Sequence, residues 1–198
     1  MPVTYTNRKG YAYYLCQGLT KKGKPRYFFA RTPKDTVLEE IPQGYEIRES
    51  VNGNVSLARV RPIELLDSEI SAVQEALNAH PKAKLYRKDV KPRQITIYES
   101  LAADLGRLAT PIKKLLGSEA EAHELVQQMQ ETEYRRAQFS PVMRFTLTDD
   151  GHRLFVAERM CYRGSVDDWI KIEIDKTIDE LCAKLICKLG TDGFFDLI

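Results

Sequence analysis

The hydrophobic pattern of the first sixty residues is that of short β-strands. Two runs rich in aromatic residues, 11–18 and 25–31, flank a lysine-rich stretch that contains Gly23, and together they predict a β-hairpin. A second hairpin is predicted for 45–51 and 55–60, around the turn Asn52-Gly53-Asn54. Both faces of the first hairpin carry large side chains, so the second face requires a cover from the rest of the chain or a ligand.

Beyond Pro62 the spacing of apolar residues becomes helical. Residues 67–80 form the first predicted helix, with Asp67 or Ser68 as its cap and Pro81 as its stop. Ser118 and Glu121 form a capping box for a later helix. The central part is therefore predicted to contain two strands, at 84–90 and 94–98. A helix over 100–116, interrupted near Gly106, and a longer helix over 119–138 follow them.

The C-terminal third predicts a sheet closed by a helix. Strands 142–148 and 152–161 turn at Asp150-Gly151, and a two-residue loop would place Leu147 opposite Leu154. A third strand is predicted for 169–174. An amphipathic helix over 176–189, ended by Gly190, follows it, and 194–198 form an apolar tail. The expected fold is α+β, with N-terminal antiparallel β-hairpins, central helices and a C-terminal antiparallel sheet closed by an amphipathic helix.

A change of character near residues 61–63 divides the chain. Residues 1–62 are expected to form a basic, aromatic-rich β module and 63–198 an α+β domain, although one continuous folding unit fits the pattern as well. The 198 residues are 43% hydrophobic and 29% charged, which is typical of a globular protein. No stretch of about 18 apolar residues predicts a membrane span, and the first residues lack the apolar run of a signal peptide, so we expect a cytoplasmic protein without membrane partners.

Positive charge is concentrated at the N-terminus. The first 34 residues contain eight Lys or Arg, seven aromatic residues and no Asp or Glu. The whole chain carries +2, so the remainder carries −6. Cations interleaved with rings suit nucleic acid, which is a polyanion that also offers flat faces. A small sheet with a basic solvated face would show the same composition, so this alternative stays open.

A second basic segment follows the first predicted helix. Residues 82–93 hold six Lys or Arg against Asp89 alone. Whether this segment faces the N-terminal one depends on the fold. The residues predicted to contact nucleic acid, mainly its phosphates, are Arg8, Lys9, Lys21, Lys22, Lys24, Arg26, Lys84, Arg87 and Lys88.

The sequence gives little indication of a catalytic site. Phosphate-binding glycine loops, nucleophile elbows and zinc-protease motifs are missing from the sequence. Cys16, Cys161, Cys182 and Cys187 are scattered and suit small apolar core residues, so neither a disulfide nor a metal site is expected. No cofactor is expected either. One group of acids near the predicted C-terminal sheet could converge on a metal: Asp149, Asp150, Asp167, Asp168, Glu173 and Asp175.

Three functions follow from these features. The leading one is non-catalytic nucleic-acid binding through the basic, aromatic N-terminal hairpin. The second is a protein–protein interaction or homo-oligomeric adaptor, in which the hairpin and the apolar tail dock onto a partner or a second copy. The third is a metal-dependent carboxylate enzyme, and on balance the sequence favours a protein that is not an enzyme.

Several short segments resemble a group of uncharacterised bacterial proteins. They include Tyr5-Thr6-Asn7-Arg8-Lys9-Gly10, Tyr14-Leu15-Cys16-Gln17-Gly18 and Gly23-Lys24-Pro25-Arg26-Tyr27, with further similarity at 50–53, 163–167 and 189–192. The resemblance implies no fold, activity or site residue. Because it spans most of the chain, it favours one folding unit over a fusion of two unrelated modules.

Overall fold

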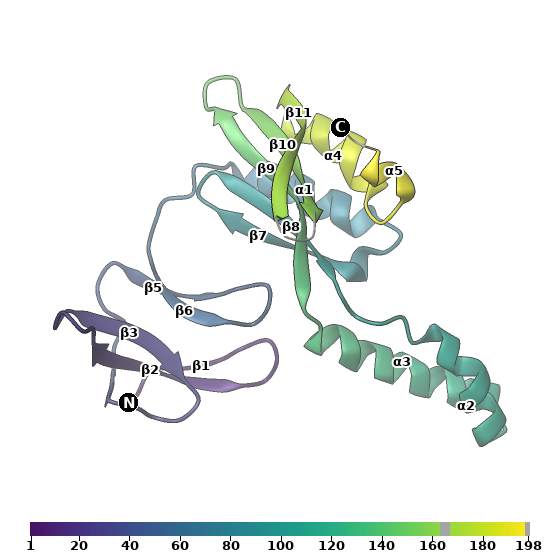
Figure 1. Ribbon diagram of the computed structural model, residues 1–198, viewed down its shortest axis with the longest axis horizontal. Coiled ribbons are helices and arrows are strands. Elements are labelled where there is room, and N and C mark those ends of the chain that lie inside the picture. The colour runs from purple at the N-terminus through teal and green to yellow at the C-terminus, as the bar shows by residue number, and fades with distance from the viewer. Residues whose placement is uncertain (163–166, 197–198) are drawn as a thin grey trace.

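The computed structural model describes residues 1–162 and 167–196 and shows an α+β architecture, as predicted (Figure 1). Short N-terminal strands form a β module. A five-stranded sheet with helices forms the body, and a helical arm projects from the body (Figure 1). No helix within the described ranges has both the length and the apolar character needed to cross a bilayer.

The β module consists of two small sheets. In the first sheet, β2 is central and pairs with the three others: β1 (Thr4–Thr6), β2 (Ala12–Leu19), β3 (Pro25–Ala30) and β4 (Thr36–Val37). The second sheet is the hairpin β5 (Tyr45–Glu49) and β6 (Val55–Arg59). Tyr27 meets Tyr45 edge-on, with ring centroids 5.7 Å apart, and Tyr5 Oη donates to Glu49 at 2.9 Å. One face of the first hairpin is therefore covered within the chain.

The rings of the first hairpin are largely covered. Those on β2 and β3 are half-buried: Tyr13, Tyr14, Tyr27, Phe28 and Phe29. Tyr11 is 44% exposed, but the Arg31 guanidinium carbon lies 3.9 Å from its ring centroid. Arg26 lies over Phe28 at 5.8 Å. Neighbours within the chain thus occupy much of the ring area that base stacking would need.

The body is an antiparallel sheet in which each strand pairs with the next one along the chain. Its strands are β7 (Tyr86–Lys91), β8 (Gln94–Ser100), β9 (Phe139–Asp149), β10 (Leu154–Tyr162) and β11 (Asp167–Lys176). Helices α1 (Asp67–Ala79), α4 (Ile178–Leu185) and α5 (Asp192–Phe195) lie together against it (Figure 1). They bury one core with the sheet, including Val73, Leu77, Ile95, Ile97, Phe145, Leu147, Phe155, Leu181 and Leu185.

The arm is inserted between the adjacent strands β8 and β9. After a 3₁₀ turn at Gly106–Leu108, α2 (Ala109–Leu116) and α3 (Glu119–Arg136) form a helical hairpin. Gly117 ends α2 with φ 75°, and Ser118 Oγ caps α3 by accepting from the Glu121 amide at 3.3 Å. The helix predicted over 100–116 is therefore wrong in its first part, because Ser100 ends β8 and 101–105 are not helical, while the helical part ends at Leu116 as predicted.

Two other local predictions are wrong. Helix α1 has Leu66 as its N-cap, and its first turn is closed by Glu69 Oε2, which accepts from the Leu66 amide at 2.8 Å. The β9–β10 turn is also longer than two residues, so Phe155 rather than Leu154 pairs with Leu147. The turn comprises four residues, 150–153, with Arg153 in a left-handed conformation (φ 54°), and a bulge in β9 between Leu147 and Asp149 leaves a net register shift of one residue.

Gly190 is required where the chain leaves α4 and the following 3₁₀ turn. It has φ 65°, and a Cβ added there would lie 2.7 Å from Tyr86 Oη. We expect Gly190→Ala to lower the free energy of unfolding by about 2 kcal/mol, because a strained backbone and a steric clash add together. Urea denaturation measures this value. Gly193→Ala is the matched control, because its Cβ would meet nothing closer than Thr191 Oγ1 at 3.8 Å. Equal losses in the two variants would contradict this account.

The cysteines differ in accessibility. All four are free thiols: Cys16 and Cys182 are buried, Cys161 is intermediate and Cys187 is exposed. Burial raises the pKa of the Cys182 thiol to about 12. Under native conditions at mildly alkaline pH we therefore expect iodoacetamide to modify Cys187 first, and Cys16 and Cys182 only after denaturation. Peptide mass spectrometry over a time course checks this order, and rapid native labelling of Cys182 would disprove it.

Candidate nucleic-acid interface

The β module docks onto the body through directed polar contacts. Asn52 exchanges two hydrogen bonds with the backbone of Phe139, donating from Nδ2 to the carbonyl at 3.0 Å and accepting from the amide at 2.7 Å. The Arg8 guanidinium donates to the carbonyls of Arg135 and Ala137 at 3.1 and 3.2 Å, where α3 ends. We call this contact region between module and body the seam.

Two basic segments meet at the seam. The guanidinium carbons of Arg8 and Arg87 lie 5.1 and 4.9 Å from the ring centroid of Phe139, which is 3% exposed. Burial, followed by the nearby charge of Arg87, lowers the pKa of Arg8. Burial and Arg8 likewise lower the pKa of Lys9. The first basic segment therefore meets the second at this ring.

A hollow next to Arg87 extends this positive region. It has a volume of about 470 Å³ and lies between the start of β7 and the last turns of α3, with Lys84, Arg87, Tyr134 and Arg135 in its wall. A neighbouring hollow of about 560 Å³ shares Lys84 and Tyr134 and adds Lys82. We call the connected cations the junction track: Arg8, Lys9, Lys82, Lys84, Arg87 and Arg135. Asp104 and Glu131 are the acids in these walls.

The junction track offers the contacts that a nucleic-acid strand needs. Lys84, Arg87 and Arg135 are exposed, so their cationic ends are accessible to phosphates. Tyr134 is half-buried in the wall of both hollows, where a base can stack on its ring. Arg8 plays a different part, because its terminal nitrogens are already bound to carbonyls. It joins module to body and thereby positions the other cations.

The hairpin tip forms a separate basic surface. Lys21, Lys22, Lys24 and Arg26 are exposed around Gly23, which has φ 74°. The tip and the loop that carries Arg8 lie at opposite ends of the eight-residue strand β2, which spans about 25 Å. The structure thus divides the N-terminal basic segment between two places.

Lys88 lies apart from both surfaces. Side chains alternate along a strand, so Lys88 points to the face of β7 opposite Arg87. Its Nζ donates to the Ile70 carbonyl of α1 at 2.8 Å, and burial lowers its pKa. Of the predicted residues, four lie in the junction track, four at the hairpin tip, and Lys88 faces α1.

Lys82, Tyr134 and Arg135 line the two hollows but are not among the predicted contact residues, although Lys82 lies within the second basic segment. Basic residues in the last turn of a helix complement its dipole, so Arg135 and Arg136 have an ordinary explanation in α3. An aromatic residue followed by Arg135 and Arg136, just before the strand that begins at Phe139, was the available signal. It repeats the combination of rings and cations seen at the N-terminus.

The acids of the C-terminal sheet are spread along its strands, with Glu173 opposite Ala157 in the middle of β10. Asp149 pairs with Leu154 and Asp168 with Cys161, so these acids are separated by about 23 Å of β10. Asp150 and Glu173 form ion pairs with Arg93 and Lys184, both at 2.7 Å. Over residues 1–162 and 167–196, no three His, Cys, Asp or Glu side chains are grouped to hold a metal ion. The predicted convergence of these acids on one metal ion is therefore not found among the described residues.

No protein-family model, curated protein or solved structure matches the chain. The resemblance of its N-terminal segments to a group of bacterial proteins stays a prediction. The function is therefore argued from the geometry of the described residues.

Proposed function

We propose that this chain is a non-catalytic nucleic-acid-binding protein, that the junction track is its main contact surface and that the hairpin tip is an outlying one. The observation that carries the proposal is the meeting of Arg8 and Arg87 around Phe139, beside the hollow that holds Lys84 and Arg135. Cations from two segments far apart in the sequence line this hollow together with Tyr134, and Arg8 adjoins it through the Phe139 ring. Such a hollow suits a phosphate backbone with stacked bases.

The balance of charge supports this function. Within the described part of the chain, Lys9, Lys82, Lys84, Arg87 and Arg135 form no ion pair with a carboxylate. Arginines of the body behave differently, since Arg93, Arg144 and Arg153 are paired with acids. Uncompensated cations grouped at one groove favour a polyanionic ligand.

Salt-dependent binding tests the proposal. Fluorescence anisotropy with labelled single-stranded DNA, single-stranded RNA and duplex DNA gives affinities at low and moderate salt. If Lys82, Lys84, Arg87 and Arg135 each contact a phosphate, raising the salt from about 50 to about 200 mM should weaken single-strand binding roughly 50-fold. Each contact contributes about −0.7 to the slope of log affinity against log salt concentration. Absence of binding to all three ligands at the lower salt concentration would refute the proposal.

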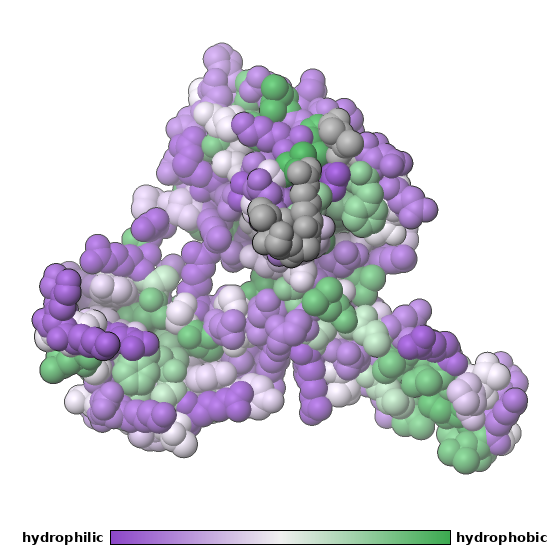
Figure 2. All heavy atoms as spheres, in the orientation of Figure 1, coloured by the Kyte–Doolittle hydropathy of each residue, from purple (hydrophilic) through white to green (hydrophobic). Residues whose placement is uncertain are grey.

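A second candidate function rests on the arm. Figure 2 shows hydrophobic residues gathered over it, and Leu115 on α2 is 85% exposed, with Leu116, Leu125 and Met129 also exposed. An apolar surface of this kind suits contact with a second copy of the chain. Light scattering would then show a dimer that Leu115→Ser converts to a monomer. A monomeric wild-type protein would exclude this candidate. The apolar tail, which was predicted to dock onto a partner, instead places Phe194 in the body core.

A further inference from the structure

A separate cleft lies at the other end of the seam. It has a volume of about 540 Å³ and is enclosed by the β5–β6 hairpin, the segment after β6 and the end of β7. Its wall shares no residue with the two hollows of the junction track. We call it the seam cleft. Its size falls in the range of roughly 300–1,000 Å³ that is usual for small-ligand sites.

Positive charge dominates the wall of the seam cleft. The module supplies Arg48 and Arg59, the connecting segment supplies Arg61 and the end of β7 supplies Lys91. Two acids, Glu46 and Asp89, face these four cations, which leaves a formal charge of +2. One acid is already engaged, because Asp89 Oδ1 accepts from Arg48 at 3.3 Å.

Three of these cations are uncompensated. Across the described residues, Arg59, Arg61 and Lys91 make no ion pair and no hydrogen bond through their side chains. The Arg59 guanidinium carbon lies 6.0 Å from the ring centroid of Tyr45, which restricts its position while leaving its N–H edge available. Ile63 and Pro92 add apolar surface to the same wall. Three cations without acidic partners in one wall favour an anionic ligand.

We propose that the seam cleft is a binding site for a phosphate group. Guanidinium groups bind phosphate oxygens in a bidentate manner, and the divalent charge of a phosphate monoester matches the +2 of the wall. The group belongs either to a small phosphorylated molecule or to the backbone of a bound nucleic-acid strand. In both cases it links module, connecting segment and body through Arg59, Arg61 and Lys91. The site does not depend on the proposed function of the junction track.

Thermal unfolding of the full chain tests the site. The probes are inorganic phosphate, pyrophosphate and AMP at about 10 mM, each compared with sodium chloride of equal ionic strength. Pyrophosphate or AMP is expected to raise the melting temperature by about 2–5 °C if its Kd is near 1 mM. The double variant Arg61→Gln/Lys91→Gln should melt like the wild type without ligand, because both side chains are exposed, and should lose the shift with ligand. The control variant Lys82→Gln/Lys84→Gln, whose changes lie in the junction track, should keep the ligand-induced rise in melting temperature.

The results distinguish a failure of the phosphate site in the seam cleft from a failure of the proposed nucleic-acid interface. No specific shift in the wild type, or an equal shift in the cleft variant, would overturn the phosphate site. Oligonucleotide binding then identifies the source of the phosphate: several-fold weaker binding by the cleft variant indicates a strand, and unchanged binding indicates a small molecule. A wild type that is stabilised by AMP but binds no oligonucleotide would retain the seam cleft and refute the function of the junction track.

Discussion

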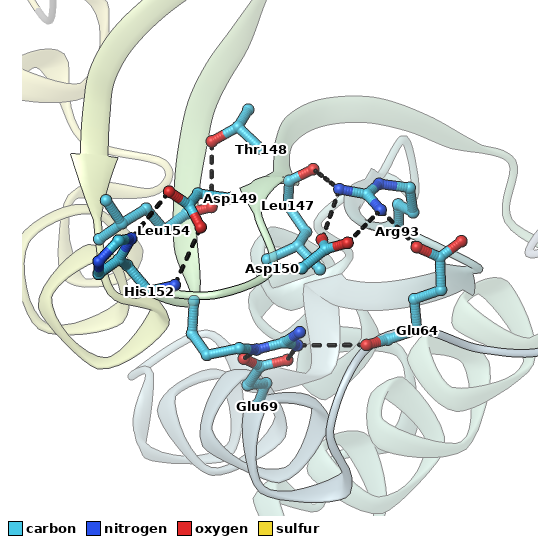
Figure 3. A network of polar contacts seen from close by, with 10 residues as sticks. Glu64, Glu69, Arg93, Leu147, Thr148, Asp149, Asp150, His152 and Leu154 are labelled. Atoms are coloured by element: carbon cyan, nitrogen blue, oxygen red, sulfur yellow. Dashed lines mark hydrogen bonds and ion pairs between the residues drawn. The ribbon is translucent and has the colours of Figure 1, made fainter.

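Replacing Arg153 by alanine is expected to lower the free energy of unfolding by about 3 kcal/mol, because it leaves a buried carboxylate without its cation. Glu69 is 5% exposed and accepts from Arg153 Nε at 2.8 Å, below the β9–β10 turn that carries Asp150 and His152 (Figure 3). Glu69 also closes the first turn of α1 by accepting from the Leu66 amide. Arg153 donates further to the Glu64 carbonyl at 3.2 Å. One side chain thus joins the β9–β10 turn to the start of α1.

Urea denaturation of Arg153→Ala and Arg153→Gly measures this contribution. The glycine variant removes the strain of the left-handed backbone (φ 54°) but still loses the ion pair, so it should also be clearly destabilised. Arg93→Ala is the control, because its partners Glu64 and Asp150 are exposed, and a much smaller change is expected. Similar losses for the Arg93 and Arg153 variants would show that burial of Glu69 is not the cause.

Neutralising the junction track is expected to have the largest effect on binding. The triple variant Lys84→Gln/Arg87→Gln/Arg135→Gln should bind a single-stranded oligonucleotide about 30- to 100-fold more weakly at low salt, and its salt slope should fall by about 2. The reason is the loss of three phosphate contacts around the hollow beside Phe139. Anisotropy titrations at several salt concentrations give both quantities.

The matched control changes the net charge equally at other places. Lys114→Gln/Lys171→Gln/Lys176→Gln removes three exposed lysines from the arm and from β11, the edge strand farthest from β7 in the sheet. It should keep nearly all of the affinity. Equal weakening of both triple variants would mean that binding follows overall charge and not the junction track. Melting temperatures of both variants show whether the loss of Arg87 from the Phe139 ring affects folding.

Much of the fold could be predicted because local patterns agree with tertiary packing. The apolar stripe of 67–80 and the glycine turns of the two N-terminal hairpins specify their elements without distant contacts. The register of β9 and β10 could not be predicted in this way. It depends on a bulge in β9 and on a four-residue turn that contains a left-handed arginine, a conformation that turn preferences do not assign to Arg153.

The candidate site was predictable only in its parts. Charge runs marked Arg8 and Arg87 separately, but their meeting depends on the docking of Asn52 against Phe139, a contact between residues 87 positions apart. No local pattern encodes such a contact. The orientation of Lys88 could have been predicted, because alternate side chains of β7 point to opposite faces of the sheet and Lys88 follows Arg87 directly.

Mapping the bound strand tests the central claim most directly. A single-stranded oligonucleotide that carries 4-thiouridine is crosslinked to the full chain by light, and the modified peptides are identified by mass spectrometry. We predict crosslinks at Tyr134 and within residues 82–87, where the walls of the two hollows lie. Crosslinks confined to other surfaces, such as the far edge of the sheet at β11, would contradict the assignment of the junction track as the nucleic-acid interface.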